Sequence, residues 1–283
     1  MRSYFYLFCL VLWTGCAFAQ LGMSATAPFN GDNLPFPAFG ASPLPSYILG
    51  GEPDRRMPQL SAPVTLPRMA PQLALEIYQD RMAEQNAALL SYSATTLVHA
   101  ELPDAAQWGE FELQRHYAAP RSLSFAPVHF AGDSFVKTNV IGRVLQSEVD
   151  HLQKDDLALT ALTPANYKFS YKGTAQIQNR AVHVYQVKPR KKRAGLFKGH
   201  IFLDAHTGSL VRAEGTVVKS PSLFIKKIDF VQDYADVGSF TFPVHIHSEA
   251  RTRLVGRAIV DIYERQYTAV TKTSLAQQQA PAL

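Results

Sequence analysis

The residues best suited to chemistry in this 283-residue chain are His245 and His247. Side chains two residues apart on a strand point to the same face, so both imidazoles could contact one metal ion, and Glu249 would continue the row. A metal site needs further ligands, and nothing in the sequence places them. We therefore expect an exposed polar strand face and rank a metal-assisted hydrolase as the least favoured of three functional hypotheses.

Other catalytic patterns are missing from the sequence. It contains no Gly-rich phosphate loop, no G-x-S-x-G nucleophile elbow and no H-E-x-x-H zinc motif. The neighbouring carboxylates Asp155 and Asp156 form a poor acid–base pair, because adjacent residues seldom point at one substrate. The sequence thus favours a protein that is not an enzyme and that uses no metal and no cofactor.

The stretch 198–267 is predicted to be a series of antiparallel strands with Gly-bearing turns at 205–208 and 235–239. Within 240–253, the apolar residues Phe242 and Ile246 alternate with the polar residues His245 and His247. This alternation is typical of a sheet with one apolar face and one wet face. Another part of the chain must therefore cover the apolar face.

Two amphipathic segments, 72–90 and 138–153, are predicted to be the covering helices, and Pro71 suits the first helical position. Further strands are expected at 92–101, 109–117, 121–127, 134–137, 167–172 and 181–188. A long antiparallel sheet curls as it twists. The predicted fold class is therefore α+β: a strongly curved antiparallel sheet, forming an incomplete β-barrel, with two or more helices covering its concave face.

Aromatic and aliphatic side chains gather on one side of the predicted strands. We expect the concave face to form an apolar pocket for lipid or acyl chains. The alternative is that the helices fill the concavity and leave a plain core. The residues predicted to line the pocket are Phe111, Phe125, Phe169, Tyr171, Phe224, Ile228, Phe230, Tyr234, Phe242, Val244 and Ile246.

The N-terminus is predicted to direct export. Arg2 precedes a short apolar run that ends in the small-x-small pattern Ala17-Phe18-Ala19, so residues 1–19 resemble a signal peptide and indicate a periplasmic protein. Both cysteines, Cys9 and Cys16, lie within this segment, which predicts a mature chain without disulfides. An alternative is an outer-membrane lipoprotein anchored at Cys16.

The remaining segments are expected to lie outside the folded domain, 71–268. Ten of the 18 prolines fall between Pro28 and Pro71, so residues 20–70 are predicted to be a disordered linker, or a docking arm for an envelope protein through residues 21–69. Residues 269–283 are predicted to be a flexible tail. We expect a monomer.

The net charge of +5 at pH 7 permits peripheral contact with an anionic membrane but gives no reason to expect a nucleic-acid partner. The strongest basic run, Arg190–Arg193, lies between two predicted strands. We expect it to be a solvated loop, with lipid headgroups or an acidic partner as the alternative contact.

The order of these elements resembles the LolA/LolB-type lipoprotein-carrier fold, which RseB-like periplasmic sensors share. The resemblance covers residues 72–267 and is carried by short motifs at the ends of elements: Leu90-Ser91-Tyr92-Ser93-Ala94, Gly132-Asp133-Ser134-Phe135-Val136-Lys137, Gly199-His200-Ile201-Phe202-Leu203-Asp204 and Val237-Gly238-Ser239-Phe240-Thr241-Phe242-Pro243.

The resemblance implies an exported, cofactor-free protein whose half-barrel encloses a hydrophobic cavity for lipid or lipoprotein acyl groups, with a role in envelope lipoprotein trafficking. The second hypothesis is a cell-envelope sensor or protein-interaction module that uses the same fold as a scaffold. The long Pro-rich segment and the basic loop Arg190–Arg193 depart from a minimal carrier.

Overall fold

The computed structural model describes residues 68–154, 157–219, 225–253 and 256–272. The predicted signal peptide, most of the Pro-rich segment and Phe224 lie outside the described residues. Among those described, no helix is both long enough and apolar enough to cross a membrane.

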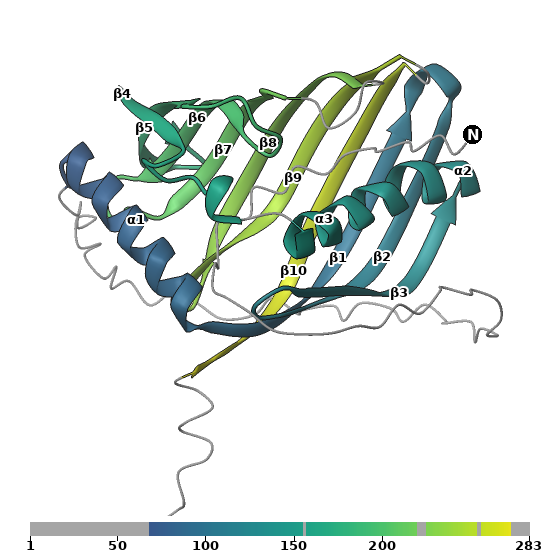
Figure 1. Cartoon of the computed structure of the whole chain (residues 1–283), viewed down its shortest axis with the longest axis horizontal. Coiled ribbons are helices and arrows are strands. Elements are labelled where there is room, and N and C mark those ends of the chain that lie inside the picture. Colours follow the sequence, from purple (N-terminus) through teal and green to yellow (C-terminus); the bar gives the residue numbers. More distant parts are fainter. Residues whose placement is uncertain (1–67, 155–156, 220–224, 254–255, 273–283) are drawn as a thin grey trace, which may run out of the picture. The chain divides into compact units, whose positions relative to one another are not determined.

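The described residues form one ten-stranded antiparallel sheet and two main helical segments (Figure 1). The strand order is β3-β2-β1-β10-β9-β8-β7-β6-β5-β4, so the first and last strands of the domain, β1 and β10, are neighbours. The strands are β1 (Leu89–Leu102), β2 (Gln107–Ala118), β3 (Ser122–Gly132), β4 (Tyr167–Ile177), β5 (Arg180–Pro189), β6 (Phe197–Asp204), β7 (Leu210–Val217), β8 (Ile225–Val237), β9 (Phe240–Thr252) and β10 (Arg257–Thr271).

The sheet curves without closing into a barrel, because the outer strands β3 and β4 are not paired with each other in the described sheet. The predicted fold class is therefore confirmed. Two strands approach closely at one point: Gly199 of β6 lies opposite Gly215 of β7, and a Cβ atom on Gly199 would come within 1.9 Å of the carbonyl oxygen of Glu214. Only glycine fits where the two strands approach so closely.

Helix α1 (Pro71–Ala88) begins at the predicted proline. The second helical segment joins α2 (Ser134–Val136), a π-helical stretch Lys137–Ile141 and α3 (Gly142–Lys154). The prediction of a strand at 134–137 was wrong. Val136 and Val140 belong to the apolar stripe that continues through Val144, and burial of this stripe outweighs the strand preference of Phe135 and Val136.

The apolar strand faces and both helical segments contribute to a main core cluster, and a second cluster lies around Tyr92 and Phe242. In β1, burial alternates strictly from Tyr92 to Leu102, which leaves the intervening residues toward solvent. The outer face carries ion pairs such as Arg212–Asp233, with Nε and Oδ1 2.6 Å apart. β10 continues to Thr271 and pairs there with β1, three residues beyond the predicted domain end.

Candidate ligand-binding site

The structure gathers most of the predicted pocket residues on the helix-covered face. Phe111, Ile228, Phe230, Tyr234 and Ile246 are buried in one apolar cluster, which also contains residues of both helical segments. Phe242 is buried in an adjoining cluster with Tyr92 and Phe240, while Phe125 and Phe169 are partly buried against the core. Eight of the eleven predicted residues therefore belong to these two clusters, which together form the apolar floor under the helices.

Two predicted residues lie elsewhere. Tyr171 is 44% exposed on the edge strand β4, where its ring packs against those of His183 and Tyr185. Val244 is only partly buried, because the β8–β9 register shifts between Asp233 and Tyr234 and Val244 has no cross-strand partner there. Simple alternation along the sequence could not reveal this bulge.

The segment 134–154 is packed closely on one half of this floor. Val140, Ile141, Val144 and Leu145 all belong to the main core cluster. The fit is completed by a buried charge network around Arg115 of β2, whose side chain hydrogen-bonds Glu148 of α3, and which reaches Glu264 of β10 at 2.8 Å.

The polar groups around Arg115 are hydrogen-bonded to one another. Arg115 Nε donates to the hydroxyl of Tyr92 at 2.9 Å, and the hydroxyl of Tyr267 donates to Glu264. Burial alone would lower the pKa of Arg115, but the carboxylate of Glu264 and neighbouring groups raise it overall, so the guanidinium stays charged. This network fixes α3 to the sheet rather than offering a free charge to a ligand.

Helix α1 covers the other half of the floor and is packed much less. Only Ala74 and Tyr78 of its 18 residues are buried. Leu75 and Met82 are partly buried against the core. Polar contacts add to the attachment: Arg81 to Ser209, Gln85 Nε2 to the carbonyl oxygen of Ser239 at 2.9 Å, and Tyr185 to the carbonyl oxygen of Pro71. Such a helix can separate from the sheet at lower cost than α3.

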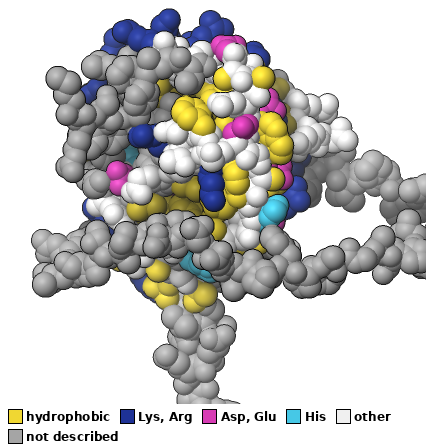
Figure 2. All heavy atoms as spheres, turned by 90° about the vertical axis from the view of Figure 1, so that its right-hand side faces the viewer, with side chains coloured by type: hydrophobic (Ala, Val, Ile, Leu, Met, Phe, Trp, Pro, Cys, Tyr) yellow, Lys and Arg dark blue, Asp and Glu magenta, His cyan; other side chains and the backbone are white. Residues whose placement is uncertain are grey.

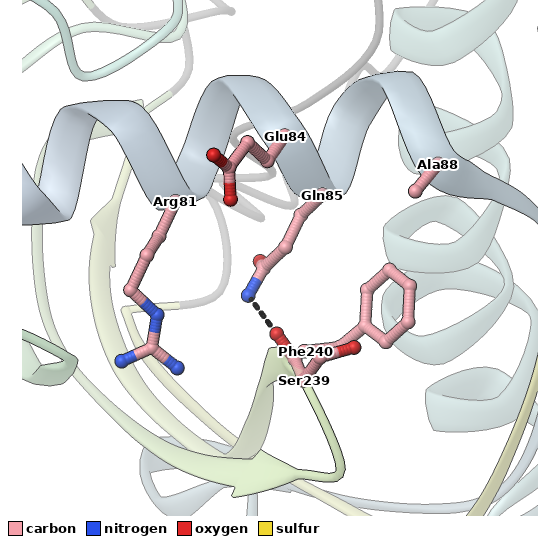
Figure 3. A pocket seen from close by; sticks show the side chains of 6 residues that line it. All are labelled: Arg81, Glu84, Gln85, Ala88, Ser239 and Phe240. Carbon is pink, nitrogen blue, oxygen red and sulfur yellow. Dashed lines mark hydrogen bonds between the residues drawn. The ribbon is translucent and has the colours of Figure 1, made fainter.

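A pocket of about 280 Å³ opens between the C-terminal half of α1 and the turn that joins β8 to β9 (Figure 3). Gln85 and Ala88 face Ser239 and Phe240 across it. Phe240 stacks on Phe242, with ring centroids 5.8 Å apart, so the pocket adjoins the second apolar cluster. The complete lining is Arg81, Glu84, Gln85, Ala88, Ser239 and Phe240.

Several polar groups are buried in the apolar interior without partners. Gln232 is fully buried, and neither its amide nitrogen nor its amide oxygen has a hydrogen bond; the same holds for the hydroxyls of Tyr78 and Thr96. Burial, and to a lesser degree Tyr167, raise the pKa of Tyr78. The Tyr78 hydroxyl therefore stays neutral and can both donate and accept.

The two histidines lie on the outer face, as predicted. His245 Nε2 and His247 Nδ1 both contact Oδ1 of Asp261, at 3.0 and 2.9 Å. Among the described residues, no group of three or more His, Cys, Asp or Glu side chains could hold a metal ion. The contacts therefore describe a polar surface pair on one carboxylate.

Two groups of basic side chains bear on ligand or membrane contact. In the predicted basic loop, Arg190 and Arg193 donate to the carbonyl oxygens of Pro164 and Leu159, at 2.8 and 3.1 Å, and so hold the segment that precedes β4. A second group was not predicted: Lys227, Arg251 and Arg257 are exposed and directly opposite one another across β8, β9 and β10. Figure 2 shows Lys and Arg side chains along the top edge of that view.

Sequence reasoning missed residues that contribute to the floor from other strands. Phe197, Val187 and Val260 were absent from the predicted set because the order of strands decides which of them face the helices. Gln232 was missed although its spacing from Phe230 and Tyr234 places it on the apolar face of β8, where a polar residue breaks the alternation. This break was the signal that could have found it.

No family model matches the chain, and no curated protein matches it in sequence. Solved structures do resemble it. A LolA superfamily protein from Nitrosomonas europaea matches with 11% identity and a TM-score of 0.35, covering 70% of this chain and 92% of that one.

Two further similar structures are a putative outer membrane lipoprotein-sorting protein domain from Vibrio parahaemolyticus and a DUF1329 family protein from Desulfovibrio piger. Their identities are 10% and 8%, and their TM-scores 0.34 and 0.36; they cover 73% and 70% of this chain and 97% and 92% of their own. Solved structures similar to this chain thus include the family that its sequence motifs resemble. At such low similarity, ligand and partner must be inferred from the chain's own residues.

Proposed function

We propose that this protein is a non-enzymatic carrier that binds the acyl chains of lipids or lipoproteins on the concave face of its half-barrel. The observation that carries the proposal is the contrast between the two covers. The segment 134–154 is fixed by apolar packing and the Arg115 network, whereas α1 buries only two side chains over an apolar floor.

Displacing α1 would expose a wall suited to hydrocarbon. Phe230, Tyr234 and Phe240 come from the strands beneath or beside it, and the pocket at Gln85 and Ser239 already separates part of the helix from the sheet. Each methylene buried there would contribute about 0.8 kcal/mol, so one chain could bind without directional contacts. In this proposal the protein is exported, as its N-terminal sequence predicts.

The row Lys227–Arg251–Arg257 supports contact with an anionic membrane surface. Like charges directly opposite one another destabilise a sheet, so an external anion would relieve the repulsion. Lys227 is itself paired with Asp229 at 2.6 Å, which leaves the row cationic overall. Membrane contact through this basic row would hold the carrier next to the membrane from which it takes its lipid or to which it delivers it.

To test whether α1 must move for a ligand to bind, α1 is cross-linked to the β8–β9 turn. Gln85→Cys and Ser239→Cys, in a chain with Cys9→Ser and Cys16→Ser, are linked with a short bismaleimide after removal of co-purified lipid. We expect a fluorescent fatty-acyl probe to bind the linked protein about tenfold or more weakly than the same variant capped with N-ethylmaleimide.

Equal binding by the linked and the capped protein would contradict a role for α1. No saturable binding by either protein, or by the unmodified chain, would contradict the carrier itself and favour the interaction module with residues 21–69 as its arm. A pull-down with and without that segment would then follow.

A further inference from the structure

Gln232 is the buried polar residue that the core leaves without hydrogen bonds. It lies in β8 with 0% of its surface exposed, between the buried residues Ala213 of β7 and Ile246 of β9. Its amide nitrogen and amide oxygen are both unpaired. Buried amides in native proteins are almost always hydrogen-bonded, so this one calls for a partner from outside the described residues.

A second unpaired group comes from the helix that covers this region. Tyr78 of α1 is buried in the same apolar cluster as Tyr167 and Tyr234, and its hydroxyl has no partner. Tyr234 lies two residues beyond Gln232 on the same strand, so the two side chains project from the same face. The floor beneath α1 therefore combines apolar walls with unpaired donors and acceptors.

The chemistry of these groups limits what they can bind. Arg115 is the only buried Lys or Arg among the described residues, and its guanidinium already forms ion pairs with Glu148 and Glu264. A charged fatty-acid carboxylate would lack a counter-ion here, and burying an unpaired charge is unfavourable. A neutral ester or amide suits the site, because its carbonyl oxygen can accept from Gln232 Nε2 while a neighbouring O–H or N–H of the ligand donates to Oε1.

We propose that Gln232, together with Tyr78, forms a polar subsite that binds the neutral ester or amide group of an acyl ligand within the concave face. This inference rests on the proposed carrier function and adds a preference to it. Apolar surfaces would provide most of the affinity, and the subsite would select acylglycerols or N-acyl groups over free fatty acids.

The experiment measures displacement of a fluorescent acyl probe by a monoacylglycerol and by the fatty acid of the same chain length. The unmodified chain should bind the monoacylglycerol more tightly. In Gln232→Met, which keeps the side-chain length but removes both polar atoms, the affinity for the monoacylglycerol should fall about tenfold while that for the fatty acid stays within about twofold. Tyr78→Phe should cause a smaller loss in the same direction.

Gln186→Met is the matched control, because Gln186 of β5 is only half-buried and lies outside the core clusters. It should leave both affinities unchanged. The thermal midpoint of Gln232→Met should rise, since the variant no longer buries an unpaired amide.

Failure of this inference differs from failure of the carrier function. If Gln232→Met binds both ligands with the same preference as the unmodified chain, the polar subsite is overturned and the carrier stands. A lowered midpoint with unchanged preference would show that Gln232 serves the stability of the fold and not ligand binding, and would also overturn the subsite. If the unmodified chain binds neither ligand, the carrier function fails, and the subsite fails with it.

Discussion

Arg115 is the residue that ties the helical cover to the sheet most directly. Its side chain is 2% exposed and joins Glu148 of α3 to Glu264 of β10. Taking charges out of water is unfavourable, so a buried guanidinium is tolerated only when carboxylates of opposite charge are buried beside it. Removing one partner of a buried ion pair therefore costs much more stability than losing a surface ion pair.

We therefore expect Arg115→Met to lower the free energy of unfolding by about 3–5 kcal/mol, because two carboxylates remain buried without a counter-charge. Urea denaturation followed by circular dichroism measures the change. Arg121→Met is the control: the exposed Arg121 only donates to the carbonyl oxygen of Gln153 at 3.2 Å, so the shift should stay near 0.5 kcal/mol. Replacing Arg115, Glu148 and Glu264 together with apolar residues should restore much of the loss, and a further loss would contradict the proposed cause.

At the scale of elements, the two covers differ in how they are attached. The segment 134–154 presents a sustained apolar stripe, with Val136, Val140, Ile141 and Val144 nearly inaccessible to solvent. Helix α1 leaves Leu73 46% exposed and supplements its limited packing with polar contacts of Arg81 and Gln85. Helices in proteins are stabilised mainly by packing of an apolar face, so α1 has the smaller reason to stay in place.

This difference predicts separate opening of α1. In hydrogen exchange followed by mass spectrometry, peptides from 71–88 should exchange through local opening, well before peptides from 142–153 and β1. Saturation with an acyl ligand should change the exchange of α1 more than that of α3. Equal protection of the two helices, at the level of global unfolding, would argue against α1 as the movable cover.

At the scale of the whole molecule, charge is distributed unevenly over the described surface. Lys227, Arg251 and Arg257 form a row at one end of the sheet. Two opposing effects act on the pKa of Asp229 beside this row. Partial burial raises this pKa, whereas hydrogen bonds from Lys227 and Thr216 lower it, and together with nearby positive charges they bring the net shift below the usual value. The carboxylate therefore remains ionised and neutralises only part of the row.

We expect Arg251→Gln with Arg257→Gln to weaken binding to vesicles that contain anionic lipid. Each basic residue near such a surface contributes about 1 kcal/mol, so removing two should lower the partition coefficient about thirtyfold. Co-sedimentation with vesicles at low salt measures this, and added salt should reduce the difference. Lys191→Gln with Lys192→Gln makes the same charge change in the basic loop; if it has the larger effect, the membrane contact lies there instead.

The sequence by itself determined the class of fold and most of the local structure, apart from the helical start at 134–137. Pro71, the four-residue spacing of the apolar residues in 138–153 and the alternation in β1, β8 and β9 are local patterns, and local patterns fix helices, strands and the face that each strand buries. They also indicated most of the apolar floor, including Phe111, Phe230 and Phe242.

Only the tertiary structure decided how those faces meet. The pairing of β1 with β10, the bulge beside Val244 and the weak packing of α1 depend on contacts between residues far apart in the chain. The same is true of Arg115 and Gln232, two buried polar residues of which one is fully matched and the other unpaired. Whether a buried polar group holds a fold together or awaits a ligand is set by its neighbours in space, which sequence spacing does not encode.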